Sequence, residues 1–165
     1  MIELRFVKWM LAFLLVSGQL HAQETKNLVI LHHNDTHSRI EPMPGSHATY
    51  PGLGGVVRQD ACVGEVRKEN PNVLLFHCGD FFQGTPYFNE FGGKVEIECM
   101  NLMRYDVVCL GNHEFDNGLD SLAARIREAH FPVVSTNLDF SGTVLDGLTE
   151  KYVILERNGL KIGVI

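Results

Sequence analysis

Leu28-Val-Ile-Leu-His-His-Asn-Asp-Thr-His37 begins with an apolar run of strand length and ends in polar residues that can bind a metal ion. The same arrangement recurs in Val73-Leu-Leu-Phe-His-Cys-Gly-Asp80 and in Val107-Val-Cys-Leu-Gly-Asn-His-Glu-Phe-Asp116. Short apolar runs bounded by turn residues are typical of buried strands. Since the ends of parallel strands meet at one edge of a sheet, where α/β folds place their sites, the three polar clusters are predicted to lie together.

The segments between these strands read as helices, so the chain alternates strand and helix and is predicted to have an α/β fold. Apolar positions at helical spacing predict helices from Gly54-Gly55 to about Asn70, from Lys94 to about Met103, and from Leu119 to Ala129. A short fourth strand is expected at 132–135. A hairpin of strands 152–156 and 160–165 is expected to turn at Asn158-Gly159.

Length and composition indicate one globular domain with its own core. The chain has 165 residues, of which 45% are hydrophobic and 21% charged, as in ordinary folded domains. The formal net charge of −6 argues against a nucleic-acid-binding surface, which needs a basic patch. Small anionic substrates remain compatible with this charge if metal ions supply local positive charge.

The first 22 residues read as a secretory signal peptide. Arg5 and Lys8 give a charged start, an apolar stretch runs from Trp9 to Val16, and Ala22 ends a segment suited to cleavage. The alternative is a membrane anchor, but the stretch is shorter than the roughly 20 residues that span a bilayer. An exported protein, periplasmic or extracellular and without a stable membrane anchor, is therefore expected.

Four cysteines follow the signal-like segment, which in an exported chain raises the possibility of disulfides. Cys78 and Cys109 lie in strand-like apolar runs and Cys62 in a helix-like one, so these three are expected to be small buried hydrophobes. The spacing lacks a CxxC pair, which makes a cysteine zinc site improbable.

The first two polar clusters offer metal ligands. Asp35 and His37 are separated by one residue, and in a strand residues i and i+2 point to the same face, so both can reach one metal ion. Asp80 follows Gly79, which permits a sharp turn, and one carboxylate can bridge two metal ions. Considered singly, His37 could be a surface histidine, and Asp35 and Asp80 could be turn caps.

The third cluster divides into a ligand and a catalytic group. Asn112 offers a neutral amide oxygen to a divalent ion. His113 faces a different direction and can act as an acid or charge stabiliser. Asp116 is placed to accept a hydrogen bond from the other imidazole nitrogen of His113. The alternative is that Asp116 caps the helix that begins near Leu119.

Together the motifs D-x-H, G-D and G-N-H-E resemble those of the calcineurin-like metallophosphatases. Asn34-Asp-Thr-His37, Gly79-Asp-Phe-Phe-Gln-Gly-Thr-Pro86, Gly111-Asn-His-Glu-Phe-Asp-Asn-Gly118 and Arg157-Asn-Gly-Leu-Lys-Ile-Gly163 are similar to the 5′-nucleotidase and UDP-sugar hydrolase family. The resemblance extends from Leu28 to Ile165. It implies the N-terminal portion of a calcineurin-like metallophosphatase sandwich.

The resemblance also implies roles and cofactors. Asp35 and His37 would bind the first of two divalent ions (Zn, Mn or Fe), Asp80 would bridge both, and Asn112 would bind the second. His113, paired with Asp116, would stabilise the transition state. The implied reaction is 5′-nucleotidase hydrolysis of a nucleoside monophosphate by a water that the two metal ions activate. The substrate is then a small-molecule nucleotide or other phosphoester.

One departure from the family pattern is His77-Cys78, where relatives more often have a small or acidic pair. A larger one is that the family's further metal-binding histidines and C-terminal substrate domain lie downstream of the residues present. Because the chain stops in the apolar run Gly163-Val-Ile165, 28–165 is expected to be a metallophosphatase domain truncated at its C-terminus. The alternatives are an inactive or metal-binding fragment, a nucleotide-sugar or cyclic-nucleotide hydrolase, and an exported α/β binding protein.

Overall fold

A parallel sheet lies at the centre of the fold in the computed structural model, which describes residues 25–165. Its strands are β1 (Ile30–His33), β2 (Leu74–His77), β3 (Val107–Cys109) and β4 (Val133–Val134). They lie in the order β1-β2-β3-β4, and every neighbouring pair is parallel. The expected α/β architecture is therefore confirmed, with the three motif-bearing strands adjacent in the sheet.

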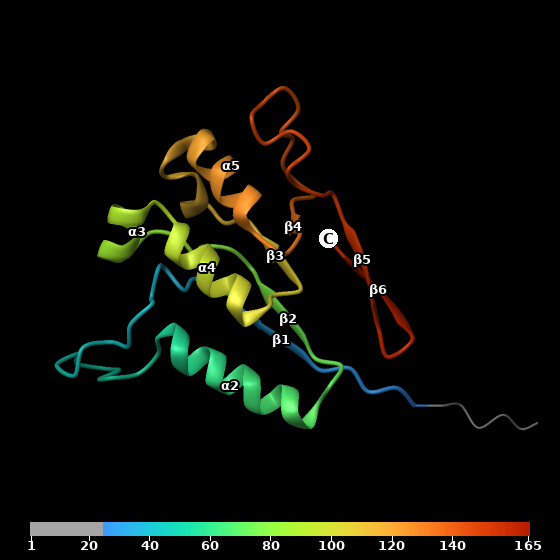
Figure 1. The fold of residues 1–165 in the computed structure, drawn as a ribbon, viewed down its shortest axis with the longest axis horizontal. Coiled ribbons are helices and arrows are strands. Elements are labelled where there is room, and N and C mark those ends of the chain that lie inside the picture. Colours follow the sequence, from blue (N-terminus) through green and yellow to red (C-terminus); the bar gives the residue numbers. More distant parts are fainter. Residues whose placement is uncertain (1–24) are drawn as a thin grey trace, which may run out of the picture.

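Helices gather on one side of this sheet, while a hairpin lies on the other side (Figure 1). The helices are α2 (Val56–Glu69), α3 (Pro86–Phe91), α4 (Lys94–Met103) and α5 (Gly118–Glu128), with a short 3₁₀ turn, η1, at His113–Phe115. The hairpin consists of antiparallel β5 (Val153–Arg157) and β6 (Leu160–Val164). Its turn has positive φ at both Asn158 and Gly159, the backbone that an Asn-Gly turn favours.

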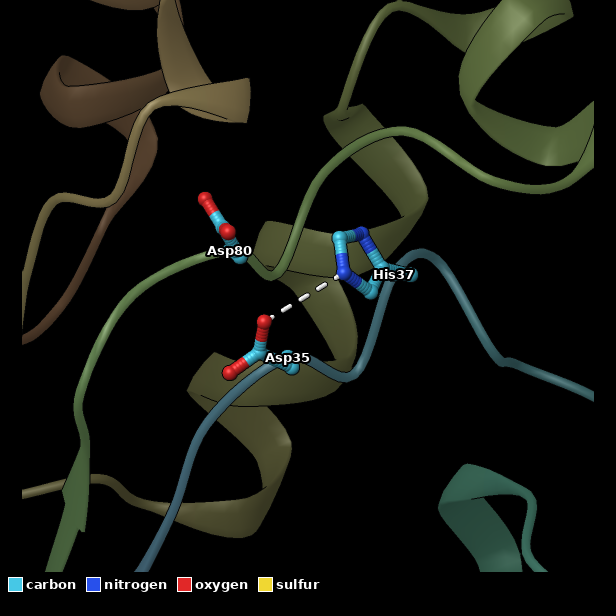
Figure 2. Close-up of side chains that lie close together, drawn as sticks. All are labelled: Asp35, His37 and Asp80. Atoms are coloured by element: carbon cyan, nitrogen blue, oxygen red, sulfur yellow. Dashed lines mark ion pairs between the residues drawn. The ribbon is translucent and has the colours of Figure 1, made fainter.

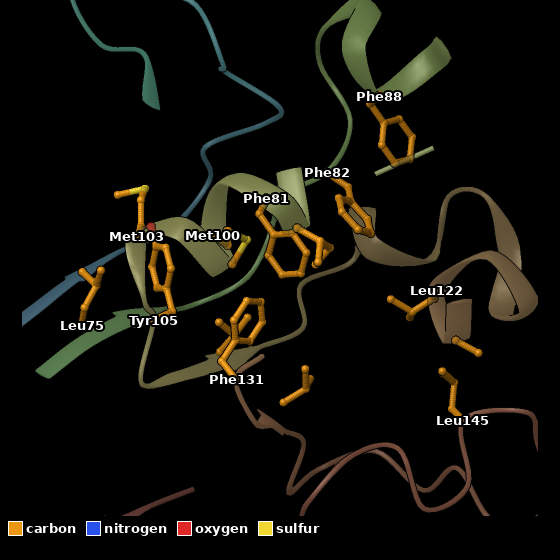
Figure 3. Close-up of a cluster of buried hydrophobic side chains, with 14 of the residues drawn as sticks. Leu75, Phe81, Phe82, Phe88, Met100, Met103, Tyr105, Leu122, Phe131 and Leu145 are labelled. Carbon is orange, nitrogen blue, oxygen red and sulfur yellow. The ribbon is translucent and has the colours of Figure 1, made fainter. Parts of the chain in front are cut away.

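The core lies between the sheet and the helices. Leu75, Val108 and Val133 point from the strands toward buried side chains of the helical layer. Figure 3 shows how aromatic rings fill this layer, with Phe81 and Phe82 packed edge to face at a centroid distance of 4.6 Å. Burying side chains of this size contributes roughly 1.5–3 kcal/mol each. The same packing fixes the loop that follows β2, because Phe81 and Phe82 come directly after Asp80.

Helix α3 is not among the elements that the sequence predicted. It begins where Thr85 accepts a hydrogen bond from the Tyr87 amide and Pro86 occupies the first turn, and it ends at Gly92 in the left-handed conformation. At six residues it is too short for a helical repeat of apolar positions to be recognised. Its start signal, a threonine cap followed by proline, is nevertheless present in the sequence.

The expectation that three of the cysteines are buried is wrong. Cys62 and Cys78 are exposed and Cys109 is intermediate, as is Cys99. All four are free in the described part of the chain, so none of the possible disulfides is formed there.

The expected signal peptide, residues 1–22, lies outside the described residues. Within residues 25–165, no helix is both long and apolar enough to cross a membrane.

Candidate metal centre

Two loops run side by side where β1 and β2 end. The amides of Asp35, His37 and Ser38 donate to the carbonyls of Gly79, Asp80 and Phe81, at 3.0, 3.0 and 2.9 Å. Strand pairing thus continues into the loops and aligns the first polar cluster with the second. This alignment is the reason that residues more than forty positions apart meet at one edge of the sheet.

The backbone of these loops adopts unusual angles at the candidate ligands. Asp35, His37 and Asp80 have φ of 55°, 45° and 57°, the left-handed region that residues other than glycine seldom occupy. The sequence reasoning placed Asp35 and His37 on one face of a strand, and that is wrong, because β1 ends at His33. The two side chains come together through a loop of left-handed residues instead. Strained conformations of this kind persist where surrounding contacts determine them, commonly at functional sites.

Asp35, His37 and Asp80 form one compact group. One ligand atom from each side chain lies within 4.8 Å of the others. His37 Nε2 is 3.5 Å from Asp35 Oδ1, and Figure 2 shows Asp80 on the neighbouring loop beside this pair. Two carboxylates and an imidazole suit Zn, Mn or Fe(II). The residues present therefore fit a divalent ion.

The third cluster packs against Asp80. The His113 amide donates to Asp80 Oδ1 at 3.0 Å, and the rings of His37 and His113 meet edge to face with centroids 5.2 Å apart. Asn112 is exposed and begins the turn η1 directly before His113. The backbone next to Asn112 is thus at the centre, while metal binding by its side chain stays a prediction.

His113 and Asp116 are paired as expected. His113 Nδ1 lies 2.8 Å from Asp116 Oδ2, and this hydrogen bond raises the pKa of His113 above its usual value. Asp116 is not the helix cap considered as an alternative, because the residue at the N-cap of α5 is Asn117. With Nδ1 held by Asp116, the imidazole can present Nε2 to a substrate.

Glu114 holds the loops of the site together, although the sequence reasoning gave it no role. It is 1% exposed, and its two carboxylate oxygens accept from four amides. Oε1 binds Phe81 N and Phe82 N at 2.8 and 3.1 Å, and Oε2 binds Asp80 N and Gly111 N at 2.9 and 2.6 Å. Burial raises the pKa of Glu114, while the amide donors oppose that rise. Glu114 therefore ties the Asp80 loop to the loop of the third cluster.

The signal that could have revealed Glu114 is its place in the G-N-H-E motif, between His113 and an apolar phenylalanine. A carboxylate in such a position is rarely left buried without donors. Only the three-dimensional structure identifies those donors as amides of a loop about 30 residues away in the sequence.

A second buried network supports the loop on the His37 side. The Ser38 hydroxyl is hydrogen-bonded to the Glu96 carboxyl group and lies 2.6 Å from Thr85 Oγ1, which donates to the Ser38 carbonyl at 2.9 Å. Glu96 comes from α4 and Thr85 from the cap of α3, so both helices hold the loop. Gly84 allows this close approach, because a Cβ there would lie 2.8 Å from the His37 carbonyl oxygen.

Comparison with known proteins relates this geometry to a family. Residues 28–164 match the model of the calcineurin-like phosphoesterases. The snake venom 5′-nucleotidase of Crotalus adamanteus is 39% identical over 145 residues, which cover 84% of this chain and 25% of that protein.

Solved structures give the same result. The 5′-nucleotidase precursor from Thermus thermophilus aligns with a TM-score of 0.77 and 39% identity over 84% of this chain and 28% of that chain. Haemophilus influenzae NAD nucleotidase aligns with a TM-score of 0.75 and 34% identity over 84% of this chain and 26% of that chain.

The chain spans about a quarter of the length of the curated relatives it matches. The matched quarter is the N-terminal part of those proteins. It contains the sheet edge with Asp35, His37 and Asp80 and the G-N-H-E turn beside it. Because residues 28–164 match the family model, and the fold and these motifs agree with it, the chain belongs to the calcineurin-like phosphoesterase family.

Proposed function

We propose that this chain carries the N-terminal metal-binding part of a 5′-nucleotidase, which hydrolyses the phosphoester of nucleoside monophosphates. The observation that carries the proposal is the convergence of Asp35, His37 and Asp80 within 4.8 Å at the edge of the sheet. The relatives support the substrate class, since those at 34–39% identity are named as nucleotidases.

In this proposal Asp35 and His37 would hold one divalent ion, Asp80 would be shared with a second, and Asn112 would offer its amide oxygen to that second ion. Two divalent ions would supply positive charge to the phosphoryl oxygens and lower the pKa of a water molecule. The two carboxylates offset the charge of the ions, and the amide adds a neutral ligand. Because the protein is acidic overall, attraction of an anionic substrate depends on this local charge.

His113 is the group that acts on the substrate. Its Nδ1 is held by Asp116 at 2.8 Å, and the raised pKa favours the protonated form. The protonated imidazole stabilises negative charge as the ester oxygen leaves, and it can donate a proton there. Its position beside His37, with ring centroids 5.2 Å apart, brings it next to the proposed metal ligands.

Replacement of His113 with alanine tests this role. Turnover of AMP should fall by about 10²–10⁴-fold, the range for a lost general acid, while the metal content stays close to that of the unaltered protein. Phosphate release and metal content by mass spectrometry are measured on the same samples. If loss of metal accounts for the whole loss of turnover, the role assigned to His113 is wrong.

A second candidate function is metal binding without catalysis, which the three-residue ligand group of Asp35, His37 and Asp80 also fits. Incubation of the chain with Mn²⁺ or Zn²⁺ and AMP, cyclic AMP or UDP-glucose separates the possibilities, with products resolved by ³¹P NMR. Preferential release of phosphate from AMP supports the 5′-nucleotidase. Metal binding without release from any ester supports the non-catalytic role.

Export is also part of the proposal. The expected signal peptide at 1–22, a relative from snake venom and a relative named as a precursor support it. A periplasmic or extracellular location would bring the site into contact with free nucleotides.

A further inference from the structure

His77 lies beneath the metal-binding loops, and the proposed function gives it no role. It ends β2 and is 2% exposed, although histidine seldom lies so deep without a partner. Its ring packs against those of His33, Phe81 and Tyr105, at centroid distances of 4.6, 5.3 and 5.9 Å. The imidazole therefore points into the helical layer, away from the exposed face of the sheet.

Each ring nitrogen of His77 has a polar partner in a different loop. The Gly79 amide donates to Nδ1 at 3.2 Å, so Nδ1 offers a lone pair. Nε2 lies 2.9 Å from Thr36 Oγ1 and is left to carry the hydrogen, which it donates to the hydroxyl. These two contacts select the neutral Nε2–H tautomer.

Burial keeps the ring in this neutral form. Desolvation and the neighbouring His33 lower the pKa of His77 to about 3, against the opposing effect of Asp35. A doubly protonated ring would also place an N–H against the Gly79 amide. Both hydrogen bonds are therefore available at neutral pH.

We propose that His77 is a positioning residue that holds the two metal-binding loops in register by hydrogen bonding to Thr36 and Gly79. Thr36 lies between Asp35 and His37, and Gly79 directly precedes Asp80, so each contact is one residue away from a proposed ligand. The inference rests on the proposed function only in assigning metal binding to those ligands.

The backbone conformation of the loops explains why they need the two hydrogen bonds with His77. Asp35, His37, Gly79 and Asp80 all have positive φ, and three of them are not glycine. Their conformation persists only if contacts around them determine it. The paired backbone amides provide part of that support, and the His77 ring adds the contact from within the core.

Two substitutions separate the hydrogen bonds from the packing. His77→Phe keeps a ring of similar size against its aromatic neighbours and removes both polar contacts. His77→Asn loses the reach to Thr36 but keeps an acceptor for the Gly79 amide, since an asparagine oxygen binds the amide two residues on in an Asx turn. Phe131→Leu is the matched control, because Phe131 packs against Tyr105 in the same buried cluster, lies outside the metal-binding loops and has no side-chain hydrogen bond to lose.

Mn²⁺ affinity, measured by titration calorimetry and by the EPR signal of free Mn²⁺, gives the main readout. His77→Phe should weaken binding by about 10–100-fold, as expected when a group that orients metal ligands is lost. His77→Asn should recover part of that loss, and Phe131→Leu should bind as the unaltered protein does despite a lower melting temperature. The proposal is overturned if His77→Phe binds normally, or if Phe131→Leu loses as much affinity.

NMR tests the contact without metal. The ¹⁵N shifts of the His77 imidazole should report the Nε2–H tautomer from about pH 5 to about pH 8, and exchange of the Gly79 amide should accelerate in His77→Phe but not in Phe131→Leu. If the unaltered protein binds no Mn²⁺, the proposed function fails. His77 is then judged by the exchange data alone, and unchanged exchange of Gly79 in His77→Phe would reject its role.

Discussion

Replacing Glu114 with glutamine preserves the size of the side chain but removes half of its capacity to accept hydrogen bonds. The carboxylate accepts from the amides of Asp80, Phe81, Phe82 and Gly111. A glutamine oxygen can keep two of these donors, while its NH₂ group faces the other two. A hydrogen bond to a charged group contributes about 1.5–3 kcal/mol, so two lost bonds should lower the free energy of unfolding by about 3–6 kcal/mol.

That loss is a large fraction of the roughly 5–15 kcal/mol that stabilises a typical domain. Urea unfolding followed by circular dichroism measures it directly. Glu98→Gln is the matched control, because Glu98 is an exposed carboxylate 3.8 Å from Lys94 on the surface of α4. Exposed pairs of this kind contribute roughly 0–1 kcal/mol.

The two variants should therefore differ by several kcal/mol for the same chemical change. A loss below about 1 kcal/mol for Glu114→Gln, with an unchanged dependence on urea, would refute the view that Glu114 ties the two loops together. The comparison with Glu98→Gln excludes a general effect of removing one negative charge.

Two further predictions concern the same loops. Asp116→Asn should shift the alkaline limb of the pH–activity profile to lower pH. Activity should be lost as pH rises through the pKa of protonated His113, and the hydrogen bond to Asp116 raises that pKa. A limb that stays in place in kcat/KM measurements would contradict this. Gly111→Ala should weaken Mn²⁺ binding by about 10–100-fold, since a Cβ there would lie 2.1 Å from Asp80 Oδ1; calorimetry that shows unaltered affinity would contradict it.

Much of the architecture could be predicted because its signals are local. Helix α4 spans Lys94–Met103, the range expected from its apolar spacing. The dipeptide Asn158-Gly159 predicts the hairpin turn because few other dipeptides accept positive φ at both positions. Helix α3 was missed because six residues are too few to show a helical repeat.

The candidate site was predictable to a different degree. The grouping of Asp35, His37 and Asp80 follows from the rule that parallel strand ends share one edge, and the structure bears out this grouping. The path by which Asp35 and His37 meet was wrong, because a strand was assumed where the chain forms a loop of left-handed residues. Local sequence gives no sign of that backbone, since it is imposed by pairing with the Gly79 loop.

Residue types and their spacing along the chain establish which groups are available for chemistry and which strands carry them. They suffice for this because metal ligands are defined by residue type, and strand ends by apolar runs and the polar residues that follow. The residues that hold those groups in place are identified only in the folded chain. Glu114 joins the Asp80 loop to the Gly111 loop, and His77 joins the loop of Asp35 and His37 to the Gly79 turn. The contacts of Glu114 with the Asp80 loop and of His77 with Thr36 join residues more than thirty positions apart. A buried donor finds its acceptor by proximity in space rather than in sequence.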